Sequence, residues 1–339
     1  MSRMRTRSRQ TPVAPTVLVL INEDDTTADM VIQALVGRGA VVAQVDPGDF
    51  PQRWTVTGRI DSAGIWRGGL VGTDVAVDLE KVTAIYYRRP SRYRVAGGLS
   101  SADRRFAEAE AHHGVGGLLS CLPCRWVSHP GRIADASAKP GQLRLAAACG
   151  LRIPETLISS SPEQVRGFVA ALGGPVVYKP MSPGALRDSD AQRAVYATLL
   201  DPAMVDEWLD AAAIGVTANQ FQRYIADKEA DLRVTAVGER LFSVAIRART
   251  QATRVDWRCD YGNLDYEAVE LPENVAAGLR AYLKAADLGF AAFDLVRTTA
   301  GEHYFLEANA NGEWGWLTDV VDLPIAEALA DLLLDGGPL

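Results

Sequence analysis

Two short apolar segments near the C-terminal end constrain this chain more than any other feature. Residues 291–297 (AAFDLVR) and 303–310 (HYFLEANA) are separated by a short stretch of turn-forming residues. Two apolar runs around such a stretch predict an antiparallel β-hairpin. With Ala300-Gly301 as a two-residue turn, Asp294 lies directly opposite Glu307.

One face of the predicted hairpin carries oxygen-bearing side chains. Glu307 and Asn309 are two residues apart, so on a strand they point to the same face. Opposed carboxylates, with Cβ atoms ~5 Å apart, repel each other unless a cation lies between them. Asp294, Glu307 and Asn309 therefore form a candidate site for a hard cation such as Mg²⁺. The alternative is a surface hairpin whose acids are solvated.

The other face of the predicted hairpin is apolar. It brings Phe293 and Leu295 against Leu306 and Ala308. A face of this kind belongs in a core, which leaves the polar side chains together on the opposite side.

Length and charge limit the classes of protein to consider. The 339 residues predict two or three domains, and the net charge of −7 argues against a general nucleic-acid binder. No apolar run reaches the ~18 residues that a membrane span requires.

Residues 1–14 are rich in arginine, lack an apolar signal segment and are expected to form a disordered tail. Four cysteines show no disulfide framework, so we expect a cytoplasmic protein.

Cys121 and Cys124 form a C-x-x-C motif with His112, His113 and His129 nearby. A zinc site would require a second paired motif at the appropriate spacing. The interpretation that we favour is two small apolar residues near a helix end.

The predicted elements form three domains of mixed α/β class. Residues 15–130 begin as a strand–helix–strand unit, which predicts an open sheet, but no G-x-G-x-x-G follows the first strand. Residues 131–216 combine short strands with helices predicted at 133–149, 162–172 and 202–213. Residues 217–339 are rich in strands and include helices predicted at 274–286 and 324–334.

Two lysines and a strand edge precede the hairpin. Lys139 lies at a helix start, and Lys179 lies on an apolar strand before a Ser/Pro/Gly loop. Separated lysines can neutralise the phosphates of ATP, and a glycine-containing loop can offer them backbone N–H groups. The edge Arg223-Tyr224-Ile225 can present main-chain groups to adenine. Metal ions at the hairpin would then bridge the phosphates.

In their order along the chain, five segments resemble those of ATP-grasp ligases. Within that superfamily the chain is most similar to maturases of ribosomally made peptides, the graspetide or microviridin-type macrocyclases. The segments are Tyr86-Tyr-Arg-Arg-Pro90, Lys139-Pro-Gly-Gln-Leu143, Asp231-Leu-Arg-Val-Thr235, Asp256-Trp-Arg258 and Phe305-Leu-Glu-Ala-Asn-Ala-Asn-Gly312. The resemblance covers essentially the whole chain. It implies an ATP-grasp fold with an N-terminal pre-grasp domain, a small central domain and a C-terminal grasp domain.

The resemblance also implies a role for each candidate residue. Lys139 and Lys179 would contact ATP phosphates, Gln222, Tyr224 and Ile225 would form the adenine hinge, and Asp294, Glu307 and Asn309 would hold Mg²⁺. Arg233 and Arg258 would meet the acceptor carboxylate and the transferred phosphoryl group. Asp227, Glu229 and Asp231 compete for the ribose hydroxyls, and Asp231 is the one that we include in the nucleotide site.

Arg88 and Arg89 follow an apolar strand, at the end where α/β sheets build their sites. Arginine binds carboxylates in a bidentate manner, so both are candidates for contact with an acidic peptide. The alternative is a salt bridge to a neighbouring acid, or simple solvation.

The chemistry expected from this resemblance is ATP-dependent joining of peptide side chains. The partner would be a ribosomal precursor peptide with a leader, which the central domain would contact, and an acidic, Thr-rich core; the family also implies a possible homodimer. One alternative is a ligase that adds a free amino acid to a peptide or protein C-terminus, and another is an inactive nucleotide-binding recognition module. The segment Asn311-Gly-Glu-Trp314 would either shape the mouth of the site or only turn the chain.

Overall fold

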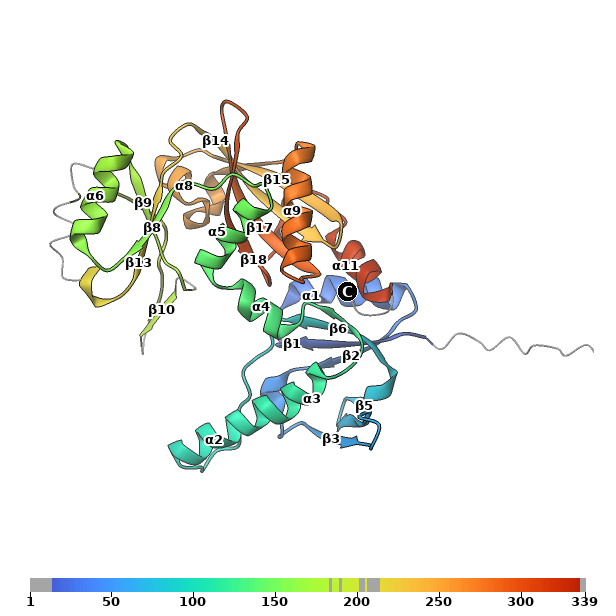
Figure 1. Ribbon diagram of the computed structural model, residues 1–339. Helices are drawn as coiled ribbons and strands as arrows, with labels where there is room; N and C mark the ends of the chain where they lie inside the picture. The colour runs from blue at the N-terminus through green and yellow to red at the C-terminus, as the bar shows by residue number, and fades with distance from the viewer. Residues whose placement is uncertain (1–13, 183–184, 189–190, 201–204, 206–213, 336–339) are drawn as a thin grey trace, which may run out of the picture. The chain divides into compact units, whose positions relative to one another are not determined.

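The chain forms two compact units of mixed α/β structure, which confirms the predicted fold class (Figure 1). The computed structural model describes residues 14–182, 185–188, 191–200, 205 and 214–335. The N-terminal unit comprises Met1–His129 and Ala326–Leu339, and the second unit comprises Pro130–Ile325. Residues 1–13 of the predicted tail, and all of the predicted helix 202–213 except Val205, lie outside the described residues.

A parallel four-stranded sheet forms the centre of the N-terminal unit. Its strands are β1 (Thr16–Ile21), β2 (Val41–Val45), β6 (Val82–Arg88) and β7 (Arg125–Val127), in the order β2-β1-β6-β7. Helix α1 (Thr26–Gly37) joins β1 to β2, and its N-terminus is capped by Asp25, whose side chain accepts from the N–H of Ala28. Because the sheet is buried, β1 is the continuous apolar run expected of a parallel strand.

The remaining elements of this unit are inserted between the strands of that sheet in the sequence, except for the last helix. An antiparallel meander comprises β3 (Trp54–Ile60), β4 (Trp66–Gly72) and β5 (Ala76–Asp78). A continuous helical stretch follows β6: α2 (Ser101–Ala111), a π-helical turn (His112–Gly116) and α3 (Gly117–Ser120). Helix α11 (Ile325–Leu334) ends the described chain, and its Asp331 forms an ion pair with Arg38 at 2.9 Å.

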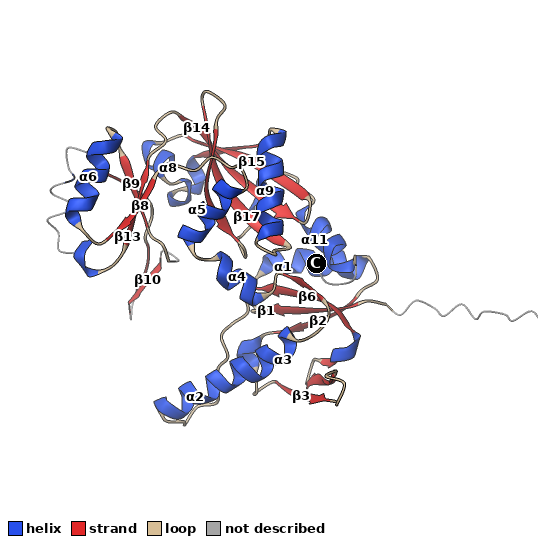
Figure 2. Ribbon diagram, viewed as in Figure 1, coloured by secondary structure: helices blue, strands red, loops and turns tan. Residues whose placement is uncertain are grey.

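The second unit begins with a small antiparallel sheet and its helices (Figure 2). The sheet order is β12-β9-β13-β8, with β8 (Thr156–Ser159), β9 (Val176–Lys179), β12 (Thr198–Leu200) and β13 (Asn219–Arg223). Helix α6 (Pro162–Leu172) packs on it through Val165 and Val169. Strands β10 (Ala185–Asp188) and β11 (Ala191–Ala194) form a separate hairpin. The single helix predicted at 133–149 is in fact two, α4 (Pro130–Ala136) and α5 (Lys139–Ala148).

A five-stranded antiparallel sheet carries the C-terminal part of this unit, in the order β16-β15-β14-β17-β18. The strands are β14 (Lys228–Val237), β15 (Arg240–Ala248), β16 (Leu264–Ala268), β17 (Phe290–Thr298) and β18 (His303–Asn309). One face packs against α5 and α9 (Glu273–Ala285) in a large apolar cluster. Two shorter helices, α8 (Gln251–Val255) and α10 (Gly315–Val320), complete the unit.

The β17–β18 hairpin has the predicted pairing of its acids but not the predicted turn. Thr298 and Glu302 close a loop of three residues, in which Gly301 adopts φ +81°, so the predicted two-residue turn is wrong. The longer loop shifts the pairing of the two strands by one residue relative to the prediction. A β-bulge at Leu306 reverses this shift, so Asp294 faces Glu307 as expected. Because of the bulge, Phe305 rather than Leu306 occupies the core, with none of its surface exposed.

Candidate nucleotide and metal site

The three predicted metal-binding side chains come together on one face of the five-stranded sheet. Asp294 on β17 pairs with Glu307 on β18, and Asn309 pairs with Ala292 two residues along. The Nδ2 atom of Asn309 lies 3.3 Å from Oδ2 of Asp294. The alternative of a surface hairpin with solvated acids does not fit, because Asp294 is buried and Glu307 is largely covered.

Two basic side chains neutralise Glu307. Lys139, at the first position of α5, forms a short ion pair with Oε2, and Nη1 of Arg258 lies 3.5 Å from Oε1. Burial alone would raise the pKa of Glu307, but the charges of Lys139 and Arg258 outweigh it and hold that pKa well below its ordinary value. Glu307 is therefore a carboxylate at any physiological pH.

Asp294 is held by Arg233 of the neighbouring strand β14. Its Oδ1 atom accepts from Nη1 of Arg233 at 2.7 Å, and both side chains are buried. Burial, together with the negative charge of Glu307, raises the pKa of Asp294 in spite of Arg233. The negative charges of Asp294 and Glu307 therefore repel each other, and a cation bound between them would reduce this repulsion.

The donor set fits Mg²⁺. Two carboxylates and one amide offer only oxygen ligands, which hard divalent cations prefer. Within the described ranges, no group of three or more His, Cys, Asp and Glu side chains is placed to hold a metal. The amide of Asn309 offers a further oxygen beside the two carboxylates. In this structure Lys139, Arg233 and Arg258 provide the positive charge instead.

Lys179 belongs to the same charged cluster. It ends β9, and burial lowers its pKa to about 8. The charge of Glu307 opposes this lowering, whereas the positive charges of Lys139, Arg258 and Lys228 contribute to it. The small sheet therefore places a lysine that readily loses its proton beside the cations of the larger sheet.

The predicted adenine hinge lies where β13 ends. The strand stops at Arg223, so Tyr224 and Ile225 follow it rather than extend it. The side chain of Gln222 is buried, and its Nε2 donates to Oγ1 of Thr156 at 3.0 Å. The N–H of Tyr224 donates to the carbonyl of Pro175 at 3.1 Å. The turn after β13 is thus fixed at both its side chains and its backbone.

Asp231 is the ribose candidate that lies nearest the cluster. It forms a buried ion pair with Lys228 at 2.8 Å, and burial raises its pKa, with Lys228 opposing the shift. The charges of Asp294 and Lys179 also act on it. Glu229, in contrast, is exposed and pairs with Arg297 at 2.7 Å. The structure therefore favours Asp231 over Glu229.

Arg258 is fixed by a buried acid two residues before it. Asp256 accepts from Nε and Nη2 of Arg258 at 2.8 and 2.9 Å, and it also accepts from the backbone N–H of Ala197 at 3.1 Å. Burial raises the pKa of Asp256, but its hydrogen bonds and the charge of Arg258 lower it overall. Asp256 therefore orients Arg258 toward Glu307 and ties it to the segment before β12.

The two arginines after β6 have different environments. Arg88 is 1% exposed, and its Nε lies 3.0 Å from Oδ2 of Asp25. This burial favours the salt-bridge interpretation over contact with a substrate. Arg89 is exposed and has φ +46°, and its carbonyl accepts from Nδ2 of Asn22 at 2.6 Å. A non-glycine residue with positive φ is uncommon and is often found at functional sites, so Arg89 stays the substrate candidate of this pair.

The two cysteines of the C-x-x-C motif have different environments. Cys124 is buried, and burial raises the pKa of its thiol to about 12, whereas Cys121 is exposed. No zinc-binding group that includes these cysteines occurs among the residues that the structure describes.

The sequence left two roles open for the segment that contains Gly312 and Glu313: to shape the mouth of the site or only to turn the chain. The carbonyl of Glu313 accepts from Nη2 of Arg233 at 2.8 Å. A Cβ at Gly312 would lie 2.6 Å from the Cβ of Ala292 and 3.1 Å from Nη2 of Arg233. The segment therefore shapes the site, since it packs closely on the sheet and holds Arg233. The Asn-Gly pair is a turn signal, but it does not indicate what the turn contacts.

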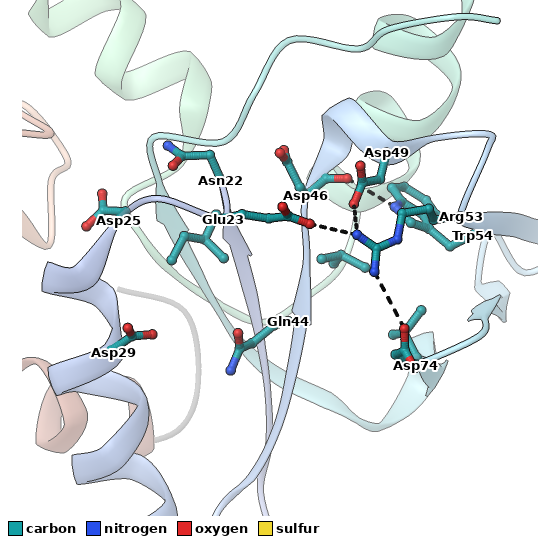
Figure 3. A pocket seen from close by; sticks show the side chains of 13 residues that line it. Asn22, Glu23, Asp25, Asp29, Gln44, Asp46, Asp49, Arg53, Trp54 and Asp74 are labelled. Atoms are coloured by element: carbon teal, nitrogen blue, oxygen red, sulfur yellow. Dashed lines mark hydrogen bonds and ion pairs between the residues drawn. The ribbon is translucent and has the colours of Figure 1, made fainter.

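The N-terminal unit has a separate cavity of about 220 Å³ (Figure 3). It lies at the ends of β1 and β2 and is lined mainly by acidic side chains. Arg53 forms ion pairs there with Glu23, Asp49 and Asp74, at 2.6, 3.4 and 3.6 Å. Three of the six acids that line this cavity thus have Arg53 as a cationic partner.

Sheet, hairpin and basic cluster together define the ATP-grasp fold, and comparison with known proteins agrees. Residues 16–134 match the family model of the MvdD pre-ATP grasp domain. The resemblance to ATP-grasp ligases of ribosomally made peptides, inferred from the sequence, is therefore confirmed at the level of fold and N-terminal domain. No curated protein matches the chain by sequence.

Three solved structures extend this agreement over the whole chain. One is a RiPP-associated ATP-grasp ligase from Chryseobacterium gregarium, in complex with ADP and a leader and core peptide. It is 24% identical to this chain, with a TM-score of 0.84, and the match covers 94% of this chain and 96% of the ligase chain. The macrocyclase MdnC from Microcystis aeruginosa MRC, bound to the precursor peptide MdnA, is 26% identical with a TM-score of 0.81 and coverage of 95% and 99%. The macrocyclase MdnB from the same organism is 27% identical with a TM-score of 0.76 and coverage of 96% and 100%. None of the helices in the described ranges is long and apolar enough to cross a membrane.

Proposed function

We propose that this protein is an ATP- and Mg²⁺-dependent peptide ligase that forms ADP. It activates Asp or Glu side chains of a ribosomal precursor peptide and joins them to Thr or Ser hydroxyls, or to Lys amines, within the same peptide. The observation that carries the proposal is the opposed pair Asp294–Glu307, surrounded by Lys139, Arg233 and Arg258 on one sheet face. Similarity to macrocyclases of known structure supports the choice of a peptide substrate.

The chemistry begins with a carboxylate that is a poor electrophile. Transfer of the γ-phosphoryl group of ATP to one of its oxygens gives an acyl phosphate and ADP. A hydroxyl or amine then attacks the acyl carbon and loses a proton, the C–O bond to phosphate breaks, and an ester or amide remains. The first step requires positive charge and in-line positioning rather than a nucleophilic side chain of the protein.

The residues of the cluster supply this charge and positioning. In the proposal, Lys139 and Lys179 contact the ATP phosphates, and Arg233 and Arg258 hold the acceptor carboxylate and the transferred group. Asp294, Glu307 and Asn309 would hold Mg²⁺, which when bound neutralises charge on the phosphates. Asp231 is assigned to the ribose, and Gln222, Tyr224 and Ile225 to adenine.

The substrate and setting follow from the same proposal. The precursor would carry a leader, contacted by residues 131–216, and an acidic, Thr-rich core that meets the exposed Arg89. We further propose that the protein works in the cytoplasm and as a homodimer.

Mass spectrometry tests this function in a reaction that contains the protein, a precursor peptide with a leader and an acidic, Thr-rich core, ATP and Mg²⁺. Each crosslink should remove the mass of one water, and ADP should appear in the same amount. A gain equal to an amino-acid residue would instead identify a ligase for free amino acids. Nucleotide binding without ADP release, with every acidic peptide tried, would identify an inactive recognition module.

A further inference from the structure

Four aromatic side chains form a connected cluster around the segment that carries Arg258. The ring centroid of Trp257 lies 5.6 Å from that of Tyr261 and 5.4 Å from that of Trp316. The ring of Trp316 also lies 5.9 Å from that of Tyr261 and 5.5 Å from that of Tyr266. The angles between these ring planes run from 38° to 90°, the tilted and edge-to-face arrangements that aromatic pairs prefer. The four side chains therefore form one contiguous aromatic cluster.

The aromatic cluster is anchored in the protein on one side and open on the other. Trp257 is buried, and Tyr266 and Trp316 are partly buried. Tyr261, in contrast, is 52% exposed. Single exposed apolar residues are ordinary on a protein surface, whereas a contiguous aromatic surface beside convergent charged groups is typical of a ligand site. The exposed ring of Tyr261 is therefore the part of the cluster that a ligand can contact.

The two segments that build this cluster are also those that position the two arginines of the site. Tyr261 comes three residues after Arg258. Trp316, on α10, comes three residues after Glu313, whose carbonyl accepts from Nη2 of Arg233 at 2.8 Å. Burial raises the pKa of Tyr261, and the positive charges of Arg258 and Arg233 act against this, so both guanidinium groups lie near its ring. A group held by both arginines would therefore lie beside the cluster.

We infer that the aromatic cluster binds an aromatic side chain of the peptide substrate, next to the Asp or Glu that becomes activated. The inference rests on the proposed function, in which Arg233 and Arg258 hold the acceptor carboxylate and the transferred phosphoryl group. Successive residues of an extended peptide are only about 3.5 Å apart, so a side chain one or two residues from the reacting acid stays within reach of Tyr261. The cluster thus selects among acidic residues of the peptide by what stands beside them.

A second tyrosine on the open side of the cluster favours an aromatic ligand over an aliphatic one. Tyr196 is 40% exposed, and its phenol is near enough to affect the pKa of Tyr261. The next residue, Ala197, donates its N–H to Asp256 at 3.1 Å, which ties Tyr196 to the segment of the cluster. A ring of the peptide would meet these tyrosines in the tilted contacts that the cluster already shows, and such contacts stabilise aromatic pairs beyond the burial of their surface. An aliphatic side chain would gain the burial alone.

Two versions of a precursor peptide test this inference with the full chain, ATP and Mg²⁺. Both have a leader and an acidic, Thr-rich core, and they carry either Phe or Ala on each side of the reacting acid. The wild-type protein should show a kcat/KM for water loss about tenfold higher with the Phe peptide, mainly through a lower KM. Tyr261→Ala should remove this preference, whereas Tyr261→Phe, which keeps the ring, should retain it. Phe106→Ala, at an exposed aromatic residue of the N-terminal unit, should also retain it.

The use of two peptides separates contact with the substrate from a structural role. If Tyr261 only supported Arg258, Tyr261→Ala would slow both peptides equally, which would overturn the inference. Weaker ADP binding by Tyr261→Ala would also overturn it, because the ring would then contact the nucleotide. Equal water loss from both peptides with the wild-type protein would refute the aromatic subsite and leave the proposed function standing. Peptide binding that depends on both Phe and Tyr261, without water loss, would support the subsite and refute the ligase function.

Discussion

At the scale of single residues, the site consists of largely buried acids that form ion pairs with basic side chains. Glu307 contacts Lys139 and Arg258, and Asp294 contacts Arg233. Removing one member of such a set leaves its partners charged and uncompensated, which costs more than the pair itself contributes. The sequence could predict the acids, since their spacing places them on one face, but it did not predict which base meets which acid.

Glu307→Gln should abolish turnover with the fold intact. The amide is a weaker ligand for Mg²⁺ and leaves Lys139 and Arg258 without their acid, so we expect a loss of about 100-fold or more in kcat. The measurement is ADP release at saturating Mg²⁺, with thermal melting to verify folding. The control is Glu302→Gln, which removes an exposed ion pair with Arg152, keeps an oxygen that can accept from the Tyr304 hydroxyl, and should change little. Retained activity in Glu307→Gln would contradict the metal assignment.

Lys179 should make nucleotide binding dependent on pH. Its pKa of about 8 lies below the ordinary lysine value, so the ammonium loses its proton, and its attraction for phosphate, as pH rises through that value. We expect ADP affinity, measured by calorimetry with Mg²⁺, to fall about tenfold from neutral pH to above the pKa, since one charge-assisted hydrogen bond contributes roughly 1.5 kcal/mol.

Lys179→Arg provides the matched control. A guanidinium keeps its charge over this range, so the variant should bind ADP with little dependence on pH. An equally steep fall in wild type and Lys179→Arg would show that another group causes the dependence.

At the scale of elements, the hairpin shows what sequence patterns can and cannot predict. The pairing of Asp294 with Glu307 was predicted from a two-residue turn, yet the turn has three residues and the bulge at Leu306 compensates for the extra one. Periodicity constrains which side chains share a face, because the wrong face would put acids in the core. Periodicity does not show where a β-bulge lies, because one polar and one apolar face remain whether or not the strand contains a bulge. The long helix predicted at 133–149 was wrong for a different reason: α4 and α5 break at Ser137 and Ala138, and the prediction did not use Pro140, which lies in the first turn of α5 and is a helix-start signal.

Gly312→Ala should damage the site through the loop that follows β18. The new Cβ would lie 2.6 Å from the Cβ of Ala292 and 3.0 Å from that of Asn309, so the loop must move and take the carbonyl of Glu313 away from Arg233. Overpacking of this kind costs about 1–3 kcal/mol. We expect lower thermal stability and a kcat/KM reduced about tenfold.

Gly167→Ala is the control for this substitution. Gly167 lies within α6, and a Cβ there would meet nothing within 4 Å, so the change should stabilise the helix by up to about 1 kcal/mol. Wild-type activity in Gly312→Ala would show that the loop does not position Arg233.

At the scale of the whole molecule, the residues of the proposed nucleotide site all belong to one of the two units. Every member from Lys139 to Asn309 lies within Pro130–Ile325, whereas the N-terminal unit has its own apolar cluster around β1 and β6. Units with separate cores can unfold separately. The composition and the order of the strands predicted the mixed α/β class, but a single sequence does not show how independently the units unfold.

A non-hydrolysable ATP analogue with Mg²⁺ should therefore stabilise only the second unit. At 100 times its Kd, a ligand that binds only the folded form adds about 2.7 kcal/mol to the free energy of unfolding. We expect hydrogen-exchange mass spectrometry during heating to show peptides of 130–325 protected to higher temperature, with those of 14–129 unchanged. The shift should disappear in Glu307→Gln and persist in Glu302→Gln. Equal protection of both units would mean that they unfold as one cooperative body, and the nucleotide would then stabilise the whole chain.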